Sequence, residues 1–137
     1  MPRDGEPPSL LASVDRVIAM SHVTPNPHVA VIGRHTLPFV LALLSHGCGG
    51  VRSLRPDTPA PDCEHADLAW IIDVGDAHEL DEALRAAHRR TGATGRVVLE
   101  DAACRHCLET LRQHAADAGF DIVSFDSVTR RLMLAPR

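Results

Sequence analysis

The chain has 137 residues, of which 45% are hydrophobic and 23% are charged, and its formal net charge is −4. This composition is typical of one globular domain, and the net negative charge argues against a general nucleic-acid or anionic-membrane surface. All 14 basic residues are arginines, and the sequence contains neither lysine nor tyrosine. Lysine Schiff-base chemistry, a phosphate-loop lysine and tyrosine acid–base chemistry are therefore excluded.

The compartment is predicted from what the sequence lacks. It has no apolar span of 18 residues to cross a membrane, and its first residues lack the apolar core and cleavage site of a secretory signal. Disulfides persist in oxidising compartments, which a chain without such a signal is not expected to reach, so its four cysteines are predicted to be reduced thiols. We therefore expect a cytoplasmic protein.

The amino-terminal part is predicted to begin with a loose tail over residues 1–8 and an amphipathic helix over 9–20. A strand over 29–33 then leads through a tight turn into an almost entirely apolar helix. Thr36 is predicted to cap this helix and Gly47 to end it. A helix without a polar face is expected to be covered on more than one side, by the sheet and by neighbouring helices or a second subunit.

The remaining elements alternate between strands and helices and end in a hairpin. We expect a strand over 51–54, a proline-rich loop over 55–65 and a central strand over 66–74. The capping-box pair Asp76 and Glu79 then opens a helix, which is followed by a strand over 96–100 and by a helix with an apolar stripe from Cys104 to Ala118 that Gly119 ends. The last predicted elements are antiparallel strands over 120–125 and 128–134 around a turn at Asp126-Ser127. This alternation predicts an α/β fold, with a mostly parallel sheet, in one domain over residues 9–137.

Polar residues follow the strands at one edge of this predicted sheet. They are Arg34, His35, Asp73, Asp76 and Glu100. Because the carboxyl ends of parallel strands meet at one edge, we expect these side chains to line one crevice. His35, Asp73 and Glu100 are the candidates for acid–base catalysis, and Arg34 could hold an anion. The alternative is structural: Asp76 caps its helix, and the others are solvated loop residues.

A second candidate site is the pair Cys104 and Cys107, which a thiol-redox protein would place at the start of a helix. Both cysteines lie on the apolar stripe of their predicted helix, so core packing is the favoured interpretation. Cys63 and His65 could join them in a zinc site, but neither half matches a known ligand loop. We therefore predict no metal site.

The two predicted helices around the first strand carry more apolar surface than one sheet face hides. Exposed apolar patches mark association, so a homodimer or another protein partner is one expectation. The other is that the two helices cover each other.

Several stretches resemble a known family. They are similar to the fourth and fifth strands, the helices after them and the terminal hairpin of class I S-adenosylmethionine-dependent methyltransferases. The stretches are ADLAWIIDV, ELDEALRAAHRRTGATGRVVLE, LETLRQHAADAGFDIV and RRLMLAP. The resemblance covers about residues 28–136 and implies a Rossmann-like three-layer sandwich with strand order 2-1-3-4-6-5 and an antiparallel last strand. It also implies that one strand and two helices of the full family fold are missing.

The resemblance also marks where S-adenosylmethionine would bind. The family turn reads acid-x-Gly-x-Gly-x-Gly, and only its first glycine is kept, since the corresponding residues here are Val31, Gly33, His35 and Leu37. Arg55 stands where the family has an acid at the end of the second strand. The positions that the resemblance assigns to the cofactor are Gly33, Arg34, His35, Asp57 and Asp73.

Three functional hypotheses fit the sequence. The first is a methyltransferase-like domain that has lost its cofactor loop and binds a partner or a small ligand without methyl transfer. The second is an active methyltransferase with an atypical cofactor pocket, using Asp73 or His35 near the methyl acceptor. The third is a thiol-redox or metal-binding protein centred on Cys104 and Cys107. The replacement of two loop glycines by His35 and Leu37 favours the first.

Overall fold

A computed structural model of the chain describes residues 10–21, 27–55, 66–74, 76–91, 94–100, 108–126 and 131–137. Its elements, in chain order, are α1 (Leu10–Ser21), β1 (His28–Gly33), α2 (Leu37–His46), β2 (Gly50–Leu54), β3 (Leu68–Asp73), α3 (Ala77–Thr91), β4 (Arg96–Leu99), α4 (Leu108–Asp117), β5 (Phe120–Asp126) and β6 (Arg131–Pro136). Each strand and helix expected from the sequence is present within the described residues, and the predicted tail over residues 1–8, the proline-rich loop beyond residue 55 and the helix start at Cys104 lie outside them. None of the helices that the structure describes is long and apolar enough to span a membrane.

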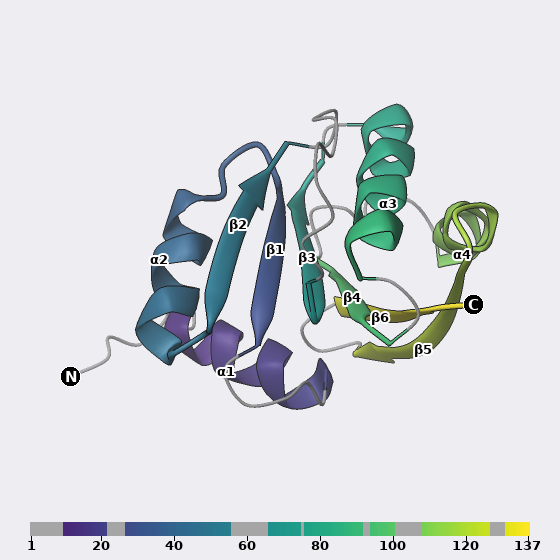
Figure 1. Ribbon diagram of the computed structural model, residues 1–137. Helices are drawn as coiled ribbons and strands as arrows, with labels where there is room; N and C mark the ends of the chain where they lie inside the picture. Colours follow the sequence, from purple (N-terminus) through teal and green to yellow (C-terminus); the bar gives the residue numbers. More distant parts are fainter. Residues whose placement is uncertain are drawn as a thin grey trace, which may run out of the picture.

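The six strands form one mixed sheet in the order β2-β1-β3-β4-β6-β5 (Figure 1). Strand β1 pairs in parallel with β2 and β3, and β3 pairs in parallel with β4. Strand β6 pairs antiparallel with both β4 and β5. The predicted α/β fold and strand order are thus confirmed, because α2 and α3 return the chain between parallel strands while β5 and β6 form a hairpin.

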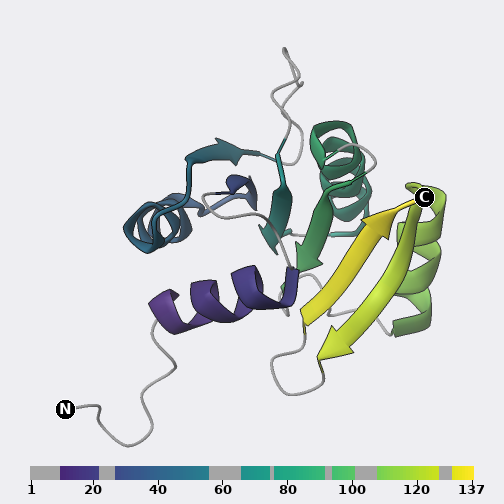
Figure 2. The same cartoon turned by 60° about the horizontal axis from the view of Figure 1, so that its bottom comes forward.

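Helices cover both faces of the sheet, with α1 and α2 on one side and α3 and α4 on the other (Figures 1 and 2). Alternate residues of each strand therefore enter two separate core clusters. On β1, Val31 packs on the α1/α2 side and Ile32 on the α3/α4 side. Trp70 of β3 is fully buried on the α1/α2 side, where it meets Phe39 of α2 edge-on with ring centroids 5.1 Å apart.

The two ends of α2 are formed differently from each other. Gly47 ends the helix with a left-handed φ of 100°, and its N–H donates to the Leu44 carbonyl, as predicted. Thr36 stands at the N-cap of α2, as predicted, but its side chain makes no capping hydrogen bond. Thr36 has helical backbone angles, and its hydroxyl bonds to the Ser53 hydroxyl of β2 instead of to a helix N–H.

Helix α2 is covered on its inner side and open on its outer side. Its inner face buries Ala42 and Leu43, and α1 packs beside it. Leu37, Leu41 and Leu44 form an outer stripe, with exposed fractions of 65%, 55% and 52%. The sheet and α1 thus cover the helix on more than one side, as predicted, and the outer stripe is open in the single chain.

The hairpin differs from its prediction in its turn. Asp126 ends β5 and pairs with Arg131 of β6, so it belongs to the strand and not to the predicted turn, while Ser127 lies outside the described residues. The register of the hairpin slips between Ile122 and Ser124. Such a bulge adds a residue to one strand and breaks the period-2 pattern from which strand ends are predicted.

Candidate functional site

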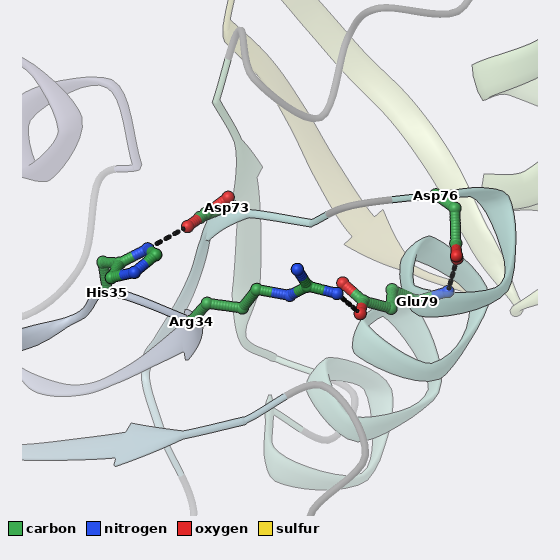
Figure 3. Close-up of polar contacts among 5 residues, drawn as sticks. All are labelled: Arg34, His35, Asp73, Asp76 and Glu79. Carbon is green, nitrogen blue, oxygen red and sulfur yellow. Dashed lines mark hydrogen bonds and ion pairs between the residues drawn. The ribbon is translucent and has the colours of Figure 1, made fainter.

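Two polar pairs lie beside each other at the carboxyl ends of β1 and β3. Arg34 and His35 follow β1, Asp73 ends β3, and Glu79 belongs to the first turn of α3. The His35 Nδ1 lies 2.8 Å from the Asp73 Oδ2, and the Arg34 guanidinium forms an ion pair with the Glu79 carboxylate (Figure 3). The His35 imidazole points toward Asp73 and the Arg34 guanidinium toward Glu79, so one turn reaches both β3 and α3 (Figure 3).

Gly33 sets the position of this turn. The register between β1 and β3 shifts at the end of β1, so that Gly33 stands opposite Asp73. A Cβ at Gly33 would lie 2.8 Å from the Ile72 Cγ1 and 3.1 Å from the Asp73 backbone nitrogen. Glycine therefore lets β1 approach β3 closely, which brings Arg34 and His35 to the end of β3. The packing of the two strands thus accounts for the glycine at this position.

Asp76 orders the start of α3. Its Oδ1 accepts a hydrogen bond of 2.9 Å from the backbone N–H of Glu79, which confirms its predicted role as a helix cap. The Glu79 carboxylate meets Arg34. The hydrogen bond to Glu79 and the charge of Glu79 raise the pKa of Arg34 above its ordinary value. The guanidinium therefore stays charged, but a carboxylate already balances it, which weakens Arg34 as a site for another anion.

The other pair has the geometry of an acid–base dyad. The Asp73 carboxylate holds one nitrogen of the His35 imidazole, and 84% of the His35 side chain is open to solvent. A histidine held in this way can accept a proton from a bound hydroxyl or amine. A histidine–carboxylate pair open to solvent at this edge of the sheet can therefore assist a proton transfer.

Glu100 does not join these residues. Its Oε1 accepts a hydrogen bond of 2.8 Å from the Trp70 indole nitrogen and pairs with the Arg131 guanidinium of β6. Trp70 belongs to the core cluster on the α1/α2 side, so the Glu100 carboxylate serves that side of the sheet. A largely buried carboxylate with two such partners joins β3, β4 and β6, and we assign it a structural role.

The other residues considered as ligands or reactive thiols lie outside the described residues: Asp57, Cys63, His65, Cys104 and Cys107. Within the described ranges, no group of three or more His, Cys, Asp or Glu side chains is placed to hold a metal ion. Cys48 is the one free cysteine in those ranges, and burial raises the pKa of its thiol.

Sequence reasoning missed the partners of three predicted residues. They are Glu79 for Arg34, Arg131 for Glu100 and Ser53 for Thr36. The Glu100–Arg131 pair could have been predicted, because the antiparallel pairing of β6 with β4 brings the first residue of β6 to the end of β4. The other two pairs join residues 45 and 17 positions apart, and no local pattern marks them.

Comparisons with known proteins concern the fold. No protein-family model matches the sequence, and no curated protein sequence matches it. The structure of the CcbJ methyltransferase from Streptomyces caelestis matches with a TM-score of 0.70 and 12% identity, over 99% of this chain and 93% of that chain. A TehB-like S-adenosylmethionine-dependent methyltransferase from Corynebacterium glutamicum matches with a TM-score of 0.60 and 14% identity, over 97% and 90% of the two chains.

A third similar structure is a ribosomal protein L11 methylase from Lactobacillus delbrueckii subsp. bulgaricus. Its TM-score is 0.64 at 16% identity, over 93% of this chain and 77% of that chain. The chain therefore has a class I methyltransferase-like fold, as its resemblance to that family implied. Since one fold hosts many functions, function has to be argued from the site.

Proposed function

We propose that this chain is a methyltransferase-like domain that binds a protein partner or a small ligand and transfers no methyl group. The turn between β1 and α2 carries the proposal. The family pattern places glycines in this turn, whereas here Arg34, His35 and Thr36 follow Gly33, and Leu37 opens α2. A cofactor that lies against the backbone needs a turn without side chains, and this turn is filled with them.

The contacts of the turn support the same conclusion. Three side-chain contacts tie it to its neighbours: Arg34 to Glu79 of α3, His35 to Asp73 of β3 and Thr36 to Ser53 of β2. The backbone agrees, because the described glycines with a positive φ, Gly47 and Gly119, lie outside this turn. S-adenosylmethionine would have to displace these contacts to reach the backbone, whereas a ligand lying above the strand ends would meet polar side chains held in place.

The outer stripe of α2 supports association with a protein. Leu37, Leu41 and Leu44 point to solvent from a helix that contains no Asp, Glu or Arg. Exposed apolar stripes of this kind favour burial against another protein. A second copy of this chain is the simplest partner, since two identical apolar stripes present no mismatched charges. Neighbouring surface must contribute as well, because a stable interface buries about 800 Å² per partner.

Cofactor binding is tested by thermal unfolding with saturating S-adenosylmethionine and, separately, S-adenosylhomocysteine. We expect no change in the unfolding midpoint with either compound. A ligand at 100 times its Kd stabilises the folded state by about 2.7 kcal/mol, which would raise the midpoint by several degrees. Adenosine is the control for unspecific binding, and a rise with both cofactors but not with adenosine would overturn the proposal.

A second candidate, an active methyltransferase with an atypical cofactor pocket, is favoured by the His35–Asp73 pair. The imidazole could take the proton of an acceptor hydroxyl or amine as the methyl group is transferred. On this hypothesis His35→Ala keeps cofactor binding and loses methyl transfer. His46→Ala is a matched control, because His46 of α2 makes a similar 2.7 Å contact with Asp15 of α1, away from the turn.

Association is tested by light scattering on the purified chain. We expect a homodimer whose Leu41→Asp variant is monomeric, because the new charge would be buried without a partner. Ser124→Asp places the same charge at an exposed position of β5, at the far edge of the sheet, and should leave the dimer intact. A wild-type monomer at all concentrations would remove the homodimer from the proposal.

A further inference from the structure

The connections of the sheet change direction between β1 and β3. From β1, helix α2 leads the chain to β2 at one edge of the sheet, whereas from β3, helix α3 leads it to β4 on the other side. The two helices lie on opposite faces of the sheet (Figures 1 and 2). In open α/β sheets such a change of direction leaves a crevice at the carboxyl ends of the two strands, where ligands commonly bind. This crevice is expected where Gly33 of β1 stands opposite Asp73 of β3.

Two side-chain contacts span these strand ends, and both start from the turn after β1. The His35 Nδ1 lies 2.8 Å from the Asp73 Oδ2, so this contact joins the end of β1 to the end of β3. The Arg34 guanidinium meets the Glu79 carboxylate, which joins the same turn to the first turn of α3 (Figure 3). These two contacts, His35–Asp73 and Arg34–Glu79, are called the latch below.

The latch contributes little to the core. The side chains of His35 and Arg34 are mostly open to solvent, and exposed contacts of this kind add little stability because water competes for both partners. The approach of β1 to β3 has a different cause, since it depends on the missing Cβ of Gly33 against Ile72 and the β3 backbone. The latch can therefore open while the two strand ends keep their places.

The two residues that replace loop glycines, His35 and Leu37, differ in where their side chains lie. Leu37, Leu41 and Leu44 are spaced four and three residues apart, so they share the outer side of α2 and are exposed there. The His35 imidazole instead reaches β3 across the strand ends. His35, and not Leu37, therefore lies over the crevice, and Arg34 lies beside it.

We propose that the latch is an autoinhibitory contact, which closes the crevice between β1 and β3 to an S-adenosyl compound. This inference rests on the proposed function, in which the turn excludes the cofactor, and it assigns that exclusion to two exposed side-chain contacts. Breaking both contacts removes the side chains from the strand ends and gives a ligand access to the backbone at Gly33. The fold beneath the latch is then still able to bind.

The test is thermal unfolding of the full chain with saturating S-adenosylhomocysteine. The double variant Arg34→Ala with His35→Ala breaks both contacts of the latch and leaves their carboxylate partners in place. Arg85→Ala with His46→Ala is the matched control, because it breaks one contact within α3 and one between α1 and α2. Far-ultraviolet circular dichroism checks that each variant is folded, and His35→Ala alone replaces the double variant if that one is not.

We expect S-adenosylhomocysteine to raise the unfolding midpoint of the variant without the latch by several degrees, and to leave the wild type and the control unchanged. Absence of a rise in the variant without the latch would overturn this inference and leave the proposed function standing. A rise in the wild type would overturn both. An equal rise in the control would overturn the latch, because contacts far from the crevice would then have the same effect.

Discussion

Two acid–arginine pairs stand at the carboxyl ends of the parallel strands, and they differ in burial. Arg34 and Glu79 link β1 to α3 with side chains that are 53% and 22% exposed. Arg131 and Glu100 link β6 to β4 with side chains that are 8% and 16% exposed, and Trp70 donates to the same carboxylate oxygen. Residue types and place in the sheet are alike, so burial decides the role. The first pair is open to solvent, and the second belongs to the core.

The largest effect is expected from Glu100→Ala. This change leaves the Arg131 charge and the Trp70 indole N–H buried without their acceptor. Removing one partner of a buried pair costs about 3–5 kcal/mol. Urea unfolding followed by tryptophan fluorescence measures this loss, since Trp70 is the single tryptophan. If Glu100→Ala lost no more stability than Arg34→Gln does, burial would not decide the roles of the two pairs.

A double variant separates the charge from the packing. Glu100→Leu with Arg131→Met replaces both charges by apolar side chains of similar length. Such replacements are often neutral or stabilising, so the double variant should recover most of the stability that Glu100→Ala loses. A double variant as unstable as the single one would mean that packing at this position, and not the unpaired charge, is responsible.

The fold could be predicted because its determinants are local. Leu80, Ala83, Leu84 and Ala87 recur at helical spacing and are all buried in α3. The continuous apolar run of β3 predicts a central strand, and its residues from Leu68 to Ile72 are indeed buried. Each of these patterns indicates which face of a helix or strand is buried. Together they predict how the helices pack on the two faces of the sheet.

The site could be predicted only in part. The strand-end rule gave the correct neighbourhood for Arg34, His35 and Asp73, because it follows from topology. It did not separate Glu100 from them, since the face on which a side chain ends depends on partners far along the chain. Thr36 stands at the N-cap, but its hydroxyl does not cap the helix for the same reason, because it bonds to the Ser53 hydroxyl of β2.

Within the exposed cluster, Asp76 makes the contact with the clearest structural value. Its carboxylate caps α3 through the N–H of Glu79, and loss of such a cap costs about 1 kcal/mol. Asp76→Ala should therefore lower stability less than Glu100→Ala does. Asp76→Asn keeps the capping oxygen and should restore most of the loss, whereas equal losses in both variants would point to the charge of Asp76 instead of its hydrogen bond.

The smallest effect is expected from Arg34→Gln. The pair with Glu79 is exposed, so water and dissolved ions screen it, and the unfolding midpoint should stay closer to the wild type than that of Asp76→Ala. Salt sharpens the contrast, because the screening length falls from about 30 Å at ~0.01 M to about 3 Å at ~1 M. Any loss in Arg34→Gln should vanish over this range, while the loss in Glu100→Ala should persist, since ions do not reach a buried pair. If the stability loss of Arg34→Gln stayed the same at high salt, the Arg34–Glu79 pair would be shielded from dissolved ions. The contacts of the turn after β1 would then stabilise the fold in the way that the buried Arg131–Glu100 pair does.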